Sequence, residues 1–114
     1  MWIFTTIGAF SIVEVRTKDD RPTGEMMVRV RDKLHLTALK KRTGCKAKIL
    51  STPHADYPYR VIVSRDNWHE YIDMLTRDIA YPNFKGACAS GPYLDKLHQV
   101  WSVYRGEPVK KVRR

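Results

Sequence analysis

The most constraining feature of the sequence is a change of periodicity at Ser64. Residues 59–64, YRVIVS, place Tyr59, Val61 and Val63 on one face, which predicts a strand with one buried side. Ser64 is a favourable helix N-cap residue. Beyond it, apolar residues recur at helical spacing: Trp68, Tyr71, Ile72, Leu75 and Ile79. The sequence therefore predicts a strand that runs directly into an amphipathic helix.

Two further strands are predicted in the first third of the chain. Residues 2–15 are rich in β-branched and aromatic residues, which favour strands, and Gly8 indicates a bulge or a break there. Residues 26–31, MMVRVR, alternate, so that the valines face one way and the arginines the other. A polar loop containing proline and glycine separates the two segments, which predicts an antiparallel hairpin.

The remaining segments alternate between helix and strand. Residues 33–43 predict a helix that Asp32 caps and Gly44 ends, with Leu34, Ala38 and Leu39 on its apolar face. Residues 45–51, CKAKILS, alternate and predict a strand with one solvated face. Residues 92–104 predict a C-terminal helix with one apolar stripe.

This order predicts an α+β fold. Without its first strand, the chain matches most of a ferredoxin-like split βαβ unit, in which the missing strand would lie beside the first one. We therefore predict a ferredoxin-like four-stranded antiparallel sheet in permuted order (β-β-α-β-β-α), with two helices on one face and an added C-terminal helix. Residues 1–106 should form a single domain, and residues 107–114 a basic C-terminal tail.

The charge balance narrows the class of partner. Lysine and arginine number 21 against 12 acidic residues, for a net charge of +9, which favours polyanions such as nucleic acid or an acidic protein face. The apolar N-terminal run lacks the basic start of a signal peptide and is too short to span a bilayer. We expect a cytoplasmic protein with no membrane association.

The basic residues predict a nucleic-acid-binding surface. Arg29, Arg31 and Arg60 should share the sheet face opposite the core. Further basic candidates lie on the first helix, the following strand and the tail: Lys40, Lys41, Arg42, Lys46, Lys48, Lys110, Lys111, Arg113 and Arg114. We identify no RNP1-like string and no exposed aromatic pair for base stacking, so the signal is electrostatic. Alternatively, the arginines pair with acids such as Asp56, Asp73 or Asp95 beneath the C-terminal helix or a second subunit.

The signs of catalysis are weaker. A metal-independent nuclease needs a histidine, a cation and a hydroxyl, and one such set lies close in sequence: His54, Tyr57, Arg60 and Arg65. The same stretch also fits a stiff turn between two prolines, which we prefer. No pair of histidines or cysteines has metal-ligand spacing, and no phosphate-binding glycine motif occurs, so we expect no metal and no cofactor.

Several blocks of the chain resemble a family of small bacterial and phage proteins with no established activity. They are MWIFTTIGAFSIV, ADYPYR, YPNFK and VWSVY, and the resemblance covers most of residues 1–104. It implies no function. The residues themselves lead to three hypotheses. The first is a non-enzymatic accessory protein that binds RNA or DNA. The second is a protein-binding regulator, for example one encoded by a phage or mobile element, that docks on an acidic or nucleic-acid-binding site of a larger nucleic-acid-processing complex, and the third is a nuclease centred on His54.

Overall fold

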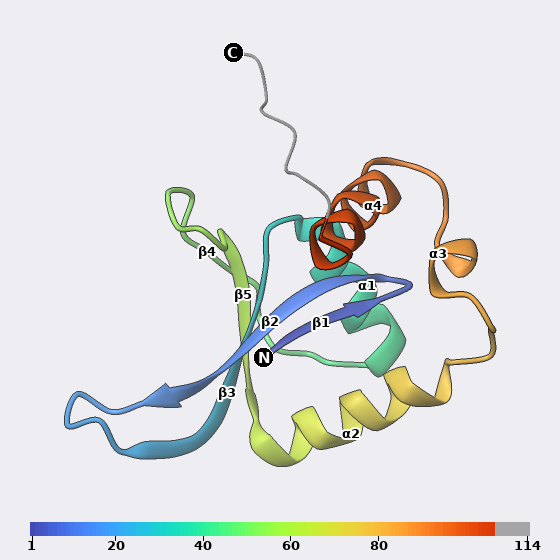
Figure 1. Ribbon diagram of the computed structural model, residues 1–114. Helices are drawn as coiled ribbons and strands as arrows, with labels where there is room; N and C mark the ends of the chain where they lie inside the picture. Colours follow the sequence, from blue (N-terminus) through green and yellow to red (C-terminus); the bar gives the residue numbers. More distant parts are fainter. Residues whose placement is uncertain (107–114) are drawn as a thin grey trace. The chain divides into compact units, whose positions relative to one another are not determined.

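The computed structural model describes residues 1–106 (Figure 1). The chain divides into two compact units, Met1–Ala80 and Tyr81–Arg114. The predicted basic residues Lys110, Lys111, Arg113 and Arg114 lie outside the described residues.

The first unit contains an antiparallel five-stranded sheet. The strands are β1 (Trp2–Thr5), β2 (Gly8–Arg16), β3 (Pro22–Val30), β4 (Leu50–Ser51) and β5 (Tyr59–Ser64). Their order across the sheet is β1-β2-β3-β5-β4, and every neighbouring pair is antiparallel. The predicted α+β class is confirmed, but the predicted number of four strands is wrong.

The fifth strand arises because the chain turns back at Gly8. The hydroxyl of Thr5 donates a hydrogen bond to the Gly8 carbonyl oxygen at 3.0 Å and accepts one from the Ile7 N–H at 3.2 Å. This tight turn divides the apolar run into β1 and β2, which pair with each other. Gly8 therefore breaks the strand, one of the two outcomes predicted for it.

The predicted strand over residues 45–51 is mostly absent. Only Leu50 and Ser51 pair with β5. Upstream of them the alternation of burial persists, because Cys45 is buried and Ala47 and Ile49 pack on the core, whereas Lys46 and Lys48 are exposed. The alternating pattern correctly marked which side chains face the core, but burial alone does not require ladder hydrogen bonds.

Helices α1 (Lys33–Thr43) and α2 (Arg65–Arg77) pack on one face of this sheet (Figure 1). Their buried residues join Ile12, Val28 and Val61 in the core. On α1 the buried leucines are Leu36 and Leu39. Leu34, predicted to lie on the apolar face, is 72% exposed, because it is two residues before the buried Leu36 and so lies on the other side of the helix.

The predicted helix ends are confirmed. The Asp32 carboxylate accepts a hydrogen bond from the Leu34 N–H, and the Ser64 hydroxyl accepts one from the Asn67 N–H. Gly44 ends α1 in the left-handed region at φ 75°, where a residue without Cβ is favoured. These caps set the points at which the chain leaves and re-enters the sheet.

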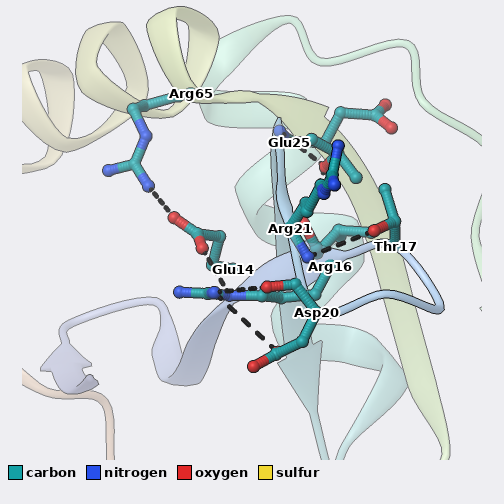
Figure 2. A network of polar contacts seen from close by, with 9 residues as sticks. Glu14, Arg16, Thr17, Asp20, Arg21, Glu25 and Arg65 are labelled. Atoms are coloured by element: carbon teal, nitrogen blue, oxygen red, sulfur yellow. Dashed lines mark hydrogen bonds and ion pairs between the residues drawn. The ribbon is translucent and has the colours of Figure 1, made fainter.

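A polar network joins the β2–β3 hairpin to the start of α2 (Figure 2). The Glu14 carboxylate lies between two guanidinium groups, 2.6 Å from Arg65 Nη2 and 2.8 Å from Arg16 Nε. Arg16 also donates to the Asp20 carbonyl oxygen at 3.0 Å, and the Arg21 N–H donates to the Thr17 hydroxyl at 3.1 Å. Arg65 is therefore held by Glu14, on the helix side of the sheet.

The second unit contains α3 (Phe84–Ala87) and α4 (Pro92–Tyr104). The Asn83 side chain caps α3, and α4 has the predicted bounds. The Trp101 ring contacts two cations, with Lys85 Nζ at 3.6 Å and the Arg105 guanidinium carbon at 4.5 Å from its centroid. Neither these helices nor the two of the first unit have the length and apolarity needed to cross a membrane.

Candidate nucleic-acid interface

One row of side chains crosses all five strands on the sheet face opposite α1 and α2. The paired positions run from Trp2 to Ser11, then to Arg29, then to Arg60, and end at Leu50. Their neighbours along the strands, such as Ile12 and Val28, belong to the core, so this row points to the other side. We call this side, which carries Trp2, Ser11, Arg29, Arg31 and Arg60, the arginine face.

The loop after β4 returns over the arginine face and brings Tyr57 onto two of these arginines. The guanidinium carbon of Arg29 lies 4.7 Å from the Tyr57 ring centroid, and that of Arg31 lies 5.3 Å from it. Both distances are within the range of cation–π attraction. Tyr57 therefore holds the two guanidinium groups in place without neutralising either charge.

Arg29 is positioned further by a buried serine. Its Nη2 donates to the Ser11 hydroxyl at 2.8 Å, and Ser11 is only 2% exposed. The Nε of Arg29 is buried and has no hydrogen-bond partner within residues 1–106. Buried donors are nearly always paired, so this unpaired Nε is an exception that adds to the free-energy cost of burying part of Arg29.

A hollow of about 420 Å³ lies beside these residues. It is lined by Trp2, Met27, Arg29, Ala55, Asp56, Tyr57 and Arg60. All of these belong to the first unit, and they come from three strands and the loop before β5. The hollow therefore combines two guanidinium groups, one carboxylate and two aromatic rings.

The three arginines of this face have no acidic partner in the described part of the chain. No carboxylate of residues 1–106 forms an ion pair with Arg29, Arg31 or Arg60. The alternative prediction, pairing with Asp56, Asp73 or Asp95, is therefore not observed there. Asp73 instead contacts Arg77 at 2.7 Å.

The aromatic residues of this face were missed by the sequence reasoning. Trp2 is 72% exposed and Phe4 is 38% exposed, and the two share one side of β1 because they are two residues apart. The residue between them, Ile3, packs on the core. The prediction that the strands lack an exposed aromatic pair is wrong. The alternation of Ile3 with its neighbours was the signal that could have revealed it.

The other predicted basic residues lie elsewhere. Lys40, Lys41 and Arg42 form the last turn of α1, in the helix layer on the opposite side of the sheet. Arg42 is already engaged, since its Nε and Nη2 donate to the two carboxylate oxygens of Asp78 at 2.7 Å each. Lys46 and Lys48 lie outside the strands. The predicted basic set is thus divided between two sides of the unit.

The candidate nuclease residues are also divided. Tyr57 and Arg60 line the hollow, whereas Arg65 is bound to Glu14 on the helix side. His54 is exposed in the loop and does not line the hollow. The structure does not bring these four residues to one place.

No metal centre is formed in the described part of the chain, where no three histidine, cysteine or acidic side chains converge as metal ligands would. Comparison with protein-family models, with curated proteins and with solved structures gave no match to this chain. The resemblance of the sequence blocks to a family of small bacterial and phage proteins therefore stays a prediction.

Proposed function

We propose that this chain is a small non-enzymatic accessory protein that binds nucleic acid through its arginine face. The observation that carries the proposal is the pairing of Arg29 with Arg60 on two neighbouring interior strands, where neither forms an ion pair with a carboxylate of residues 1–106. Two like charges placed directly opposite each other are unfavourable in a sheet. A polyanion bound on this face would relieve that repulsion.

The proposed contacts are mainly to phosphate groups. Guanidinium groups bind phosphate oxygens through paired hydrogen bonds, and such contacts dominate affinity without reading sequence. Arg31, whose guanidinium group also lies beside the Tyr57 ring, is the third cation of the arginine face. The basic tail, which contributes Lys110, Lys111, Arg113 and Arg114, would add to the attraction at long range.

We also propose a finer description of the fold. The order β2-β3-β5-β4, with α1 and α2 on one face, supports the ferredoxin-like sheet that the sequence predicts. In this interpretation β2 takes the place of the missing strand, and β1 is an additional edge strand. The arginine face is then the side of the sheet that such a unit leaves without helices of its own.

A matched pair of double variants tests the proposed function. Arg29→Gln/Arg60→Gln and Lys40→Gln/Lys41→Gln remove the same charge, but from opposite sides of the sheet. Binding of labelled RNA and DNA oligonucleotides is measured by anisotropy at about 50 mM and about 200 mM salt. We expect the arginine variant to bind more weakly and to lose about two units of the logarithmic salt slope. Equal losses in both variants, or no binding by the wild type at low salt, would contradict the proposal.

A protein partner is the second candidate, because exposed tryptophan and arginine dominate the hot spots of protein interfaces. Trp2 and Arg60 lie on one face and make such an interface chemically reasonable. In that case this chain would be a regulator, and the protein it binds would carry an acidic surface. A stoichiometric complex that survives nuclease treatment and is lost in the Arg29→Gln/Arg60→Gln variant would favour this candidate over nucleic acid.

A further inference from the structure

We infer that the hollow beside Tyr57 receives one unstacked nucleotide, so that the preferred ligand is single-stranded rather than duplex nucleic acid. This inference rests on the proposed function and specifies which form of nucleic acid the arginine face takes. Three features of the hollow support it: its size, the mixed charge of its lining and the exposed ring of Trp2 beside it.

The size of the hollow fits a small group and not a duplex. Its volume of about 420 Å³ lies in the range of pockets that enclose small ligands. A base can enter such a space only when it is not stacked and paired inside a double helix, because extrusion from a duplex costs free energy. The bases of a single strand are already unpaired, so placing one of them in the hollow costs less free energy.

The mixed charge of the lining indicates more than a phosphate site. Arg29 and Arg60 favour an anionic group, whereas the Asp56 carboxylate repels one and accepts hydrogen bonds from N–H or O–H donors. A ligand that satisfies both must carry an anion at one end and donors at the other. A nucleotide has this combination, with its phosphate at one end and the amino and imino groups of its base, or the hydroxyls of its sugar, at the other.

Arg29 supplies the cation for the phosphate end of this arrangement, because it lines the hollow. Its position is fixed by two contacts. Nη2 donates to the Ser11 hydroxyl at 2.8 Å, and the guanidinium carbon lies 4.7 Å from the Tyr57 ring centroid. The charge is therefore held beside the hollow before a ligand arrives.

The rim of the hollow carries the stacking surface. Trp2 lines the hollow and remains 72% exposed, so its ring has an open surface. It lies two strands away from Arg29, which corresponds to about 10 Å at the usual strand spacing. Bases stack on exposed aromatic rings regardless of sequence. A strand can therefore lay one base on Trp2 while a neighbouring nucleotide enters the hollow.

The first test compares single-stranded and duplex oligonucleotides with equal numbers of phosphates. The wild type should bind the single strand at least about fivefold more tightly. Trp2→Ala should lose that preference while keeping its duplex affinity, and Trp101→Ala, which alters an exposed tryptophan of the second unit, should keep it. Thermal unfolding of each variant checks folding. Should Trp2→Ala prove unstable, Trp2→Phe replaces it: quenching of tryptophan fluorescence by an oligonucleotide should disappear in Trp2→Phe and persist in Trp101→Phe.

The second test asks what Asp56 does. Asp56→Asn removes the repulsion of anions and weakens the acceptor. If the inference holds, the variant binds inorganic polyphosphate more tightly than the wild type but binds the single-stranded oligonucleotide more weakly. A gain in affinity for both probes would show that Asp56 contacts no donor and would overturn the nucleotide-in-hollow arrangement.

The two tests separate this inference from the proposed function. Equal affinity for single and double strands, with the dependence on Arg29 and Arg60 retained, would overturn the inference and leave the proposed function standing. Absence of binding to either form at low salt would overturn both.

Discussion

Arg60 lies directly opposite Arg29 on neighbouring antiparallel strands, so two positive charges face each other where an ion pair would stabilise the sheet. Like charges in this position are destabilising, by the same few tenths of a kcal/mol to about 1 kcal/mol that an opposite pair would contribute. Natural proteins retain such unfavourable contacts mainly where function requires them. This is the physical reason to regard the arginine face as a binding surface.

Replacement of Arg60 should therefore raise stability while it weakens binding. Arg60→Gln removes the repulsion with Arg29, and we expect the free energy of unfolding to rise by about 0.2–1 kcal/mol. Urea denaturation at low salt measures the change. The control is Arg77→Gln, which breaks the exposed contact with Asp73 and should give no gain. A loss of stability in Arg60→Gln would show that Arg60 has a structural role instead.

Gly8→Ala should destabilise the first unit by about 1–3 kcal/mol, because a Cβ at this position would lie 2.5 Å from the Cβ and Cγ of His35. The His35 imidazole cannot easily move away, since its Nδ1 accepts the Ala9 N–H at 3.2 Å. Thermal unfolding of Gly8→Ala, His35→Ala and the double variant measures the coupling. We expect the double variant to be less unstable than the sum of the two single variants. Additive effects would show that the clash is relieved elsewhere.

Tyr71 should make stability fall at alkaline pH. Burial, with a further contribution from the Cys45 thiol, raises the pKa of Tyr71 to about 12 from its usual 10.0. Between these values the unfolded chain loses the phenol proton while the folded chain keeps it, so stability decreases as pH rises through this range. Tyr71→Phe should show a smaller decrease in stability, measured by urea denaturation, between about pH 10 and about pH 12. The exposed Tyr104 provides the control, since Tyr104→Phe should behave as the wild type does.

The Arg42–Asp78 ion pair should make a contribution to stability that disappears in acid. The Arg42 guanidinium holds the pKa of Asp78 below its usual 3.8. A carboxyl whose pKa is lower in the folded state stabilises the fold above its usual pKa, and this stabilisation is lost as pH falls through the lowered value. The difference in stability between the wild type and Asp78→Asn should therefore shrink from about pH 7 to about pH 2, and also in high salt. Asp19→Asn, in the exposed loop after β2, removes a carboxylate that forms no ion pair within residues 1–106 and serves as the control.

Local signals in the sequence predicted most of the first unit. Asp32 and Ser64 are caps whose side chains bond the backbone within three residues, so their effect does not depend on the rest of the fold. The shared face of Arg29 and Arg60 followed from alternation within each strand and from the expected neighbourhood of the two strands.

Other features required the assembled chain. A tryptophan in an apolar strand normally indicates core, and only the turn at Gly8 makes β1 an edge strand with Trp2 exposed. The placement of Tyr57 over Arg29 depends on the path of a loop that has no periodicity. The hollow therefore forms only in the folded chain, because its lining residues come from three strands and a loop that are far apart in the sequence.

The short edge strands of the sheet limit how neighbouring copies of this chain can associate. The two edges consist of Trp2–Thr5 on one side and Leu50–Ser51 on the other, so each offers few unpaired backbone groups. Long, flat edges would let adjacent copies join sheet to sheet into fibres, and very short edge strands limit such growth. If the chain binds nucleic acid as proposed, copies lined up along one strand should therefore remain separate molecules and dissociate as single subunits.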